Sequence, residues 1–341
     1  MTRAGGAAVS VVVGPDEHGV VEHALAVAAA TGSGVHRLPD GPTVPFLAGG
    51  VADAAVAHLH YTDRLYGPNS ECAADGFCEL ASRLTGRIVV SLHDVPDPDS
   101  SGHSARRVAA YRRVSERADL LIVASTTEQE RLRRCGIDGD SRVVPLPIGP
   151  IARCRPPDRL DGRARVVGVL GFIYPGKGHA EVIAAAARAQ RKVTVWAIGR
   201  PSDGHDDVAA ALERQAATLA RHFVVTGFVD PAELADLLGT VDVPVVPTRR
   251  PSASASLNRW IAAGRRPLVA ANPYSCELAA AAPDLITLYE AERSGSLDDA
   301  IATAVDDPAW TWRAGEVPDK YTIAGVARAH LRVYEQFGGR S

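Results

Sequence analysis

The chain is poor in the residues that mark disulfide-rich, zinc-stabilised and membrane proteins. Its five cysteines are odd in number and scattered, and no two form a Cys-x-x-Cys pair. This argues against a disulfide framework and against a structural zinc site. No apolar run approaches the length of a membrane span, and the N-terminus lacks a basic region followed by an apolar signal core. We therefore expect a cytoplasmic protein without an integral membrane segment, and leave a peripheral membrane role open.

Two further features are scarce. Lysine occurs only at Lys177, Lys192 and Lys320, so the other basic residues are arginines. The net charge is only -3, which gives no reason to expect nucleic acid as the main partner.

The turn after the first predicted strand is not the Gly-x-Gly-x-x-Gly fingerprint, because Gly14 and Gly19 are separated by four residues and no third glycine follows. A nicotinamide cofactor is therefore disfavoured.

What is present is the composition of a soluble globular protein. The chain has 341 residues, of which 46% are apolar and 23% charged, enough for two domains with separate cores. Strands and helices alternate in both halves, which predicts two parallel-sheet domains with a cleft between them. A segment with five prolines, 143–157, is the predicted linker. Strands are expected at 8–13, 51–59, 87–92, 118–124, 166–170, 193–198, 223–225, 241–246, 266–270 and 285–288; helices are expected at 21–30, 181–188, 208–220, 231–238 and 323–337.

The most informative stretch is 166–186. Its apolar first part is a predicted strand, its alanine-rich last part a predicted helix, and G-F-I-Y-P-G-K-G-H lies between them. Backbone N–H groups, the helix N-terminus and Lys177 would together hold an anionic group there. The alternative is an ordinary strand-to-helix turn whose lysine is solvated.

Histidines gather in the first half of the chain. His58 and His60 flank Leu59 on a predicted strand, and His93 and Asp94 come just after the strand at 87–92. In open α/β sheets ligands collect at the carboxyl ends of the strands, so His93 is a candidate catalytic residue. His58 is expected to face the core. Further along, Ser125 or Thr126 is expected to cap a helix, with Glu128 in its first turn.

The order of the motifs resembles that of the retaining glycosyltransferases of the GT-B fold, in particular glycosyltransferase family 4 (group 1). The resemblance runs over nearly the whole chain and is carried by G-V-V-E-H, H-L-H, L-H-D-V-P, A-D-L-L-I-V-A-S-T-T-E-Q-E-R-L, G-F-I-Y-P-G-K-G-H, V-T-G-F-V-D-P-A-E-L-A-D-L-L and A-A-G-R-R-P-L-V. It implies two Rossmann-like parallel-sheet domains facing across a cleft. Residues 1–150 would bind the acceptor, residues 158–318 the nucleotide sugar, and the final helix, within 321–341, would cross back onto the first domain.

The resemblance also implies roles for single residues. Lys177 would pair with the donor diphosphate and His93 would lie close to the transferred sugar. Gly19 would approach the diphosphate, Gly227 and Phe228 would touch the base, and His60 would lie on the acceptor side. The arginine that usually precedes the lysine is absent, and Arg249, Arg250 or Arg200 would have to compensate. The full donor set is Gly19, Gly176, Lys177, Arg200, Gly227, Phe228, Arg249, Ser254, Ala255, Ser256, Leu257, Asn258 and Arg259, and the acceptor set is His60, Glu22 and Asp94.

The largest departure from the family pattern lies at 251–259. Family members usually carry two glutamates separated by seven intervening residues; the first holds the sugar hydroxyls and the second the ribose. Here the first maps to Pro251 and the second to Arg259, or to Asn258 if one residue is inserted. Ser254 and Ser256 remain to cap a helix whose first-turn N–H groups can receive phosphate oxygens. The alternative is a serine-rich loop that has lost its ligand.

The expected function is transfer of a sugar from a nucleoside diphosphate sugar, GDP- or UDP-linked, to a small soluble acceptor. The expected context is specialised metabolism such as antibiotic biosynthesis. By family likeness the reaction would retain configuration and use neither a metal nor a cofactor, because the nucleotide sugar is a co-substrate. A homodimer is left open. Two alternatives stay in view, a sugar-nucleotide epimerase of the same fold and a non-catalytic partner that only binds sugar nucleotides. The epimerase is disfavoured because such enzymes use several acidic residues that are missing here.

Overall fold

The computed structural model describes residues 8–39, 51–99, 104–149, 151, 163–249, 251 and 253–338. The chain folds into two compact units, and each is described by itself. The first comprises residues 1–147 together with 319–341, and the second comprises residues 148–318. The first unit is therefore built from both ends of the sequence. Among the described residues no helix is both long enough and apolar enough to span a membrane.

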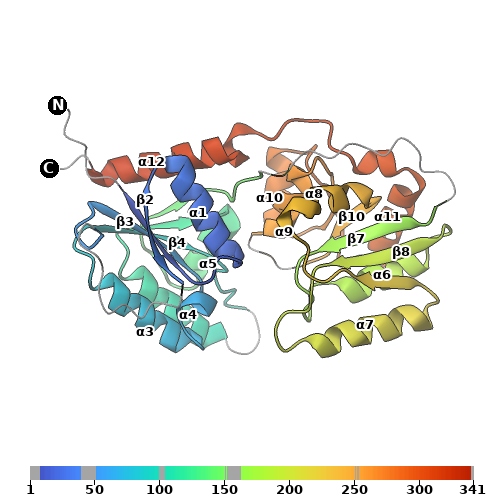
Figure 1. Ribbon diagram of the computed structural model, residues 1–341, viewed down its shortest axis with the longest axis horizontal. Helices are drawn as coiled ribbons and strands as arrows, with labels where there is room; N and C mark the ends of the chain where they lie inside the picture. Colours follow the sequence, from blue (N-terminus) through green and yellow to red (C-terminus); the bar gives the residue numbers. More distant parts are fainter. Residues whose placement is uncertain are drawn as a thin grey trace. The chain divides into compact units, whose positions relative to one another are not determined.

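The first unit is a six-stranded parallel sheet with helices on its faces (Figure 1). Its strand order is β2-β1-β3-β4-β5-β6. The strands are β1 (Val9–Val13), β2 (Gly34–Leu38), β3 (Val56–Tyr61), β4 (Arg87–Leu92), β5 (Leu120–Val123) and β6 (Ser141–Val143). The helices are α1 (Gly19–Thr31), α2 (Asp63–Tyr66), α3 (Ser70–Ala81), α4 (Ser104–Ser115), α5 (Thr126–Arg134) and α12 (Ile323–Gly338). Strand β3 is buried along its whole length, as expected for a central parallel strand.

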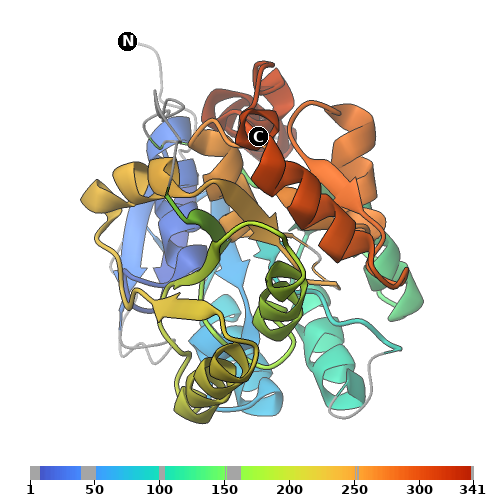
Figure 2. The same cartoon turned by 90° about the vertical axis from the view of Figure 1, so that its right-hand side faces the viewer.

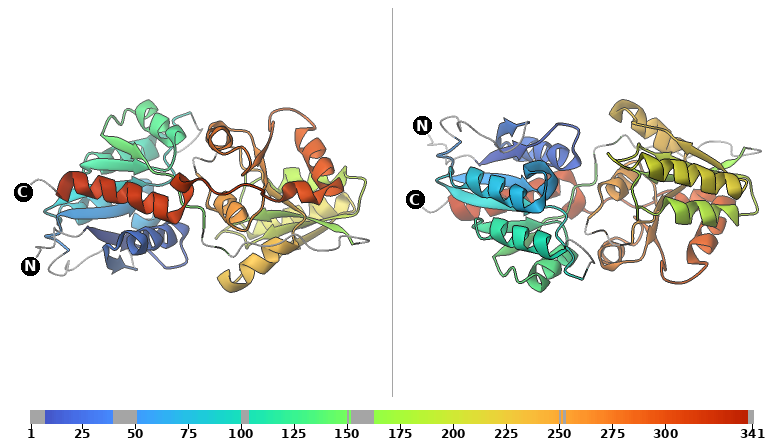
Figure 3. Two further views of the ribbon diagram at one scale, coloured as in Figure 1. Left: turned by 90° about the horizontal axis from the view of Figure 1, so that it is seen from above. Right: turned by 90° about the horizontal axis from the view of Figure 1, so that it is seen from below.

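The last helix, α12, packs on this first unit. Val326, Val333 and Tyr334 of α12 share a buried cluster with Val27 of α1 and Val56 of β3. Figure 3 shows α12 lying along the first unit, with α1 as one of the helices it contacts. The expectation that the C-terminal helix returns to the N-terminal domain is thereby confirmed.

The second unit repeats the architecture with the strand order β12-β11-β10-β7-β8-β9, all parallel. Helices α6 and α7 lie side by side in it (Figure 2). The strands are β7 (Arg165–Leu170), β8 (Val193–Ile198), β9 (His222–Val225), β10 (Val243–Val246), β11 (Leu268–Ala270) and β12 (Thr287–Tyr289). The helices are α6 (His179–Ala187), α7 (Asp206–Thr218), α8 (Pro231–Thr240), α9 (Ala255–Ala262), α10 (Pro273–Ala281) and α11 (Ser296–Asp306), with 3₁₀ turns η1 (Pro308–Thr311) and, in the first unit, η2 (Asp319–Tyr321).

Each sheet has a point where the chain reverses its direction of winding. In the first unit β1 is followed by β2 on one side, while β3 joins on its other side; in the second unit β8 and β9 continue outward from β7, while β10 joins on its other side. Ligands of open α/β sheets bind at such switch points, beyond the carboxyl ends of the strands. The candidate ligand-binding regions are therefore the loops after β1, β3 and β4 in the first unit, and the loops after β7 and β10 in the second.

The predicted fold class of two Rossmann-like parallel-sheet domains is confirmed. The strand predicted at 193–198 has those bounds, whereas the one predicted at 51–59 begins only at Val56. The missed elements are β2, β6, α2, α3, α4, α10 and α11. Strands β2 and β6 are edge strands with no fully buried residue, so they lack the apolar run by which central strands are found. Of the predicted linker, residues 150 and 152–157 lie outside the described residues.

Candidate functional site

The loop after β7 places a lysine side chain inside the second unit. The loop turns at Gly171 and Gly176, whose φ angles are 112° and 85°, and α6 begins after Gly178 at φ 97°. These left-handed conformations favour glycine. A Cβ on Gly171 would lie 3.3 Å from Lys177 Nζ, and one on Gly178 would lie 2.6 Å from Cβ of Pro247. The glycines therefore serve both the turn and the close packing of the lysine-bearing loop.

Lys177 is a buried cation with no counterion among the described residues. Its side chain is 7% exposed, and burial lowers its pKa from 10.5 to about 8. Its Nζ donates to Ser256 Oγ at 3.4 Å and lies 6.0 Å from the ring centroid of Tyr174. No ion pair joins it to a carboxylate within the described ranges. A buried charge is stable only when paired, so this arrangement favours binding of an anion at Nζ.

The neighbouring histidine is kept neutral. Burial, with the charge of Lys177 as a second cause, lowers the pKa of His179 to about 3. The Nε2 atom of His179 is buried and has no hydrogen-bond partner in the described part of the chain. At neutral pH Lys177 is therefore the cationic member of this pair.

The second component is the start of α9, which follows β10. Ser254 is the N-cap, and its Oγ accepts from Leu257 N–H at 3.2 Å and lies 3.2 Å from Ser256 Oγ. Ser256 thus links the helix start to Lys177. Asn258, one of the two positions that replace the second family glutamate, is buried, whereas Arg259 is half-buried. A helix N-terminus with a lysine beside it favours phosphate.

The remaining predicted donor residues are a glycine and a phenylalanine after β9, two arginines that pair with carboxylates, and Ala255. Gly227 has a φ of 73° and open space around it, and Phe228 after β9 is 70% exposed, so an aromatic face is available to a base. Arg200 lies over the Phe172 ring at 5.3 Å and pairs with Asp203 at 3.2 Å. Arg249 pairs with Glu292 at 3.7 Å, Ala255 is exposed on α9, and Arg250 lies outside the described residues.

The first unit gathers three histidines at its switch point. His93 follows β4 and is fixed at its backbone, because its N–H donates to the Tyr61 carbonyl at 2.8 Å and its carbonyl accepts from Tyr111 Oη at 2.5 Å. His60 Nδ1 lies 3.2 Å from His93 Nε2. His23 of α1 contacts both, with ring centroids 5.4 Å from each. Burial lowers the pKa of all three, that of His93 to about 4.

The predicted residues of the first unit differ from one another in exposure. His60, which the resemblance places on the acceptor side, is 2% exposed and so lies beneath the surface of this unit. Asp94 is exposed and has a φ of 54°, an unusual conformation for a residue other than glycine that often accompanies function. Glu22 is exposed on α1, and Gly19 has open space around it. His58 faces the core as predicted, hydrogen-bonded to Tyr334 Oη and Ser91 Oγ at 2.8 Å each.

His23 is the residue that sequence reasoning missed. It ends the family-like G-V-V-E-H motif, in which sequence reasoning predicts roles only for Gly19 and Glu22. Its position on the first turns of α1 brings it to His60 of β3 and to His93, which directly follows the neighbouring strand β4. The available signal was the placement of all three near the carboxyl edge of one parallel sheet.

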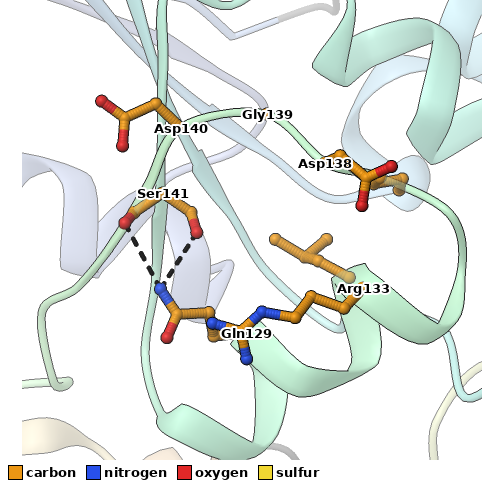
Figure 4. A pocket seen from close by; sticks show the side chains of 8 residues that line it. Gln129, Arg133, Asp138, Gly139, Asp140 and Ser141 are labelled. Atoms are coloured by element: carbon orange, nitrogen blue, oxygen red, sulfur yellow. Dashed lines mark hydrogen bonds between the residues drawn. The ribbon is translucent and has the colours of Figure 1, made fainter.

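A surface pocket elsewhere in the first unit does not coincide with these residues. It is lined by Gln129, Leu132, Arg133, Ile137, Asp138, Gly139, Asp140 and Ser141 (Figure 4). Gln129 Nε2 donates to the carbonyl and to Oγ of Ser141, so it closes one side. The pocket lies where α5 ends and β6 begins, which is the amino edge of the parallel sheet, opposite to the edge at which ligands collect.

Comparison with known proteins places the fold in a known group. Residues 164–307 match the family model described as glycosyl transferases group 1. Sucrose-phosphate synthase from Thermosynechococcus elongatus superposes with a TM-score of 0.72 at 18% identity over 98% of this chain and 100% of that chain. Anabaena HepE in complex with UDP-glucose gives 0.69 at 17% identity over 97% and 98%.

A third similar structure is AviGT4, a glycosyltransferase involved in avilamycin A biosynthesis, with a TM-score of 0.60 at 16% identity over 98% of both chains. No curated protein matches the sequence. The matched residues cover β7 to α11, including Lys177 and α9. The second unit is therefore a glycosyl transferase group 1 domain, and the whole chain has the two-domain GT-B fold.

Proposed function

We propose that the protein is a glycosyltransferase that moves a sugar from a nucleoside diphosphate sugar, GDP- or UDP-linked, to a small soluble acceptor with retention of configuration. The observation that carries the proposal is the buried Lys177, which has no counterion among the described residues and whose Nζ lies 3.4 Å from Ser256 on the first turn of α9. A diphosphate supplies the missing negative charge. The HepE complexes with UDP and UDP-glucose support a nucleotide of this kind.

The chemistry required is departure of the diphosphate from the anomeric carbon of the sugar. Negative charge grows on the leaving phosphate, and preorganised cations and N–H dipoles at that position stabilise the transition state most effectively. Lys177 and the N-terminus of α9 would act on the phosphate, with Gly19 and Gly176 allowing close approach of the backbone. Phe228 and Gly227 would receive the base.

In this proposal residues of the first unit contact the transferred sugar and the acceptor. His93, held in place through both of its backbone groups, would position the sugar or assist proton movement, while Asp94 and Glu22 offer exposed carboxylates to an acceptor. No metal and no cofactor are required for the diphosphate to leave in this proposal. The place of AviGT4 in avilamycin A biosynthesis is compatible with a role for this protein in specialised metabolism.

The first experiment is a thermal-shift screen against UDP, GDP and dTDP and their sugars, because a ligand that binds the folded state raises its stability by mass action. The nucleotide sugar that stabilises most is then used for turnover with the variants Lys177→Ala and His93→Ala. We expect both variants to lose turnover, and only Lys177→Ala to lose affinity for the nucleoside diphosphate itself. Unchanged turnover in both would refute the proposed site.

The same assay separates the alternative functions. Conversion of the donor into an epimer, without transfer, would identify an epimerase. Tight nucleotide binding without turnover of any donor would identify a binding partner of another transferase. Release of free sugar or transfer to an added acceptor would support the transferase.

A further inference from the structure

The three histidines of the first unit form a group with the chemistry of a metal site. One ring nitrogen from each of His23, His60 and His93 lies within 4.8 Å of the corresponding atoms of the other two. No other group of three or more histidine, cysteine or acidic side chains of this kind occurs in the described residues. The residues come from α1, β3 and the loop after β4, so the sheet brings them together from distant parts of the sequence.

The spacing suits a tetrahedral ion. Zinc–nitrogen bonds are about 2.0–2.1 Å long, so two ligand nitrogens at the tetrahedral angle lie about 3.3 Å apart. His60 Nδ1 and His93 Nε2 are 3.2 Å apart. All three ligand atoms lie within 4.8 Å of one another, so the remaining separations would have to shrink by at most about 1.5 Å, and rotation of the partly exposed imidazoles of His23 and His93 would suffice.

His60 presents its Nδ1 atom to His93, so Nδ1 is its ligand atom in this group. Nearby His58 is not a member of the group, because both of its ring nitrogens are already hydrogen-bonded, to Tyr334 Oη and Ser91 Oγ.

We propose that His23, His60 and His93 bind a divalent transition-metal ion, for which Zn²⁺ is the expected occupant. An all-nitrogen donor set favours ions such as Zn²⁺, Co²⁺, Ni²⁺ and Cu²⁺ and disfavours Mg²⁺ and Ca²⁺, which require oxygen ligands. His23 and His93 are only half-buried, so the fourth coordination position is reachable for water or for an oxygen or sulfur atom of a small molecule.

The sequence pattern predicts no metal, because the three histidines have none of the short spacings of known zinc motifs. The proposal does not rest on the proposed transferase function, since it concerns the first unit alone and requires no nucleotide. The metal site can therefore be disproved without disproving the transferase function, and the reverse also holds.

The test uses the full chain without a histidine tag, freed of metal by chelator and then titrated. Zn²⁺ binding is followed by calorimetry, and Co²⁺ binding by the visible absorption of a four-coordinate ion. We expect one equivalent of Zn²⁺ per chain and no binding of Mg²⁺. His23→Gln and His93→Gln should each weaken Zn²⁺ binding by more than about 100-fold, beyond the 10- to 100-fold lost with an outer-shell partner.

Two matched controls make the result specific. His222→Gln removes an exposed histidine of the second unit and should leave Zn²⁺ binding unchanged. Lys177→Met should weaken nucleotide binding but bind Zn²⁺ like the wild type. Circular dichroism establishes that each histidine variant is folded. Absence of saturable Zn²⁺ binding in the wild type overturns the proposal, whatever the variants do, and so does unchanged affinity in both folded histidine variants.

Discussion

Replacing Lys177 by methionine should change stability and ligand binding in opposite directions. Methionine has a similar length and no charge, so the variant Lys177→Met removes a buried cation that has no counterion within the described residues. The difference between the ordinary pKa of 10.5 and the value of about 8 in the folded protein corresponds to about 3 kcal/mol. We expect the unliganded variant to be more stable than the wild type at pH 7 by up to about this amount.

The sign of the pH dependence follows from proton binding. Below pH 8 Lys177 is charged in both the folded and the unfolded chain, so the cost of burying the charge is present in full. Between pH 8 and 10.5 the unfolded chain binds more protons, and the stability of the wild type therefore rises with pH. The advantage of the variant should accordingly shrink through this window and vanish above it.

Ligand binding should respond in the other direction. A hydrogen bond to a charged group contributes about 1.5–3 kcal/mol, so loss of the lysine should weaken binding of UDP or GDP by roughly 10- to 150-fold. Wild-type affinity should also fall as the pH rises above about 8, because Lys177 then loses its proton. Urea unfolding of the second unit and calorimetric titration with the nucleoside diphosphate measure the two effects.

The matched control is Lys192→Met, which removes an exposed lysine of the same unit. It should change stability by less than about 0.5 kcal/mol and leave nucleotide affinity unaltered. A variant Lys177→Met that is less stable at pH 7, or that binds the nucleotide as tightly as the wild type, would refute the description of Lys177 as an uncompensated buried cation that awaits a diphosphate.

Three further substitutions test single contacts. Ser254→Ala removes the N-cap of α9 and should lower the free energy of urea unfolding by about 1 kcal/mol, with Ser254→Gly costing less. Tyr334→Phe leaves a ring nitrogen of His58 unpaired and should lower the thermal midpoint of the first unit by the equivalent of about 1–3 kcal/mol; an unchanged midpoint would contradict the buried hydrogen bond. Gly178→Ala places a Cβ at 2.6 Å from Pro247 at a positive φ, and should weaken nucleotide binding in calorimetry even where the protein still folds.

The donor half of the site could be predicted because its signals are local. A buried strand, a glycine-rich turn and an alanine-rich helix follow one another within about twenty residues around Lys177, and each has its own physical signature. The same holds for the cap of α5, where Ser125 accepts from Glu128 N–H as predicted. Such features depend on residues that are neighbours along the chain, so a single sequence is enough to predict them.

The histidine group could not be predicted in the same way. His60 and His93 were chosen as single candidates, but their distance of 3.2 Å depends on the register of β3 against β4, and the approach of His23 depends on how α1 packs. Neither the register of β3 against β4 nor the packing of α1 can be derived from a local sequence pattern. The edge strands β2 and β6 were missed for a related reason, since their half-exposed residues do not form the apolar run of a buried parallel strand.

Charge balance in the second unit indicates how a diphosphate would be held without the usual arginine. Each phosphate group carries at least one negative charge, whereas Lys177 supplies one positive charge and the N-terminus of α9 about half of one. Buried Arg265 does not make up the difference, because its guanidinium donates hydrogen bonds to the carbonyls of Val241 and Asp242.

Arg200 and Arg249 are half-exposed and each is paired with an exposed carboxylate, at 3.2 and 3.7 Å. Such surface pairs contribute only about 0–1 kcal/mol, so exchanging a carboxylate for a phosphate costs little, and we expect these two arginines to give nucleotide binding its dependence on salt.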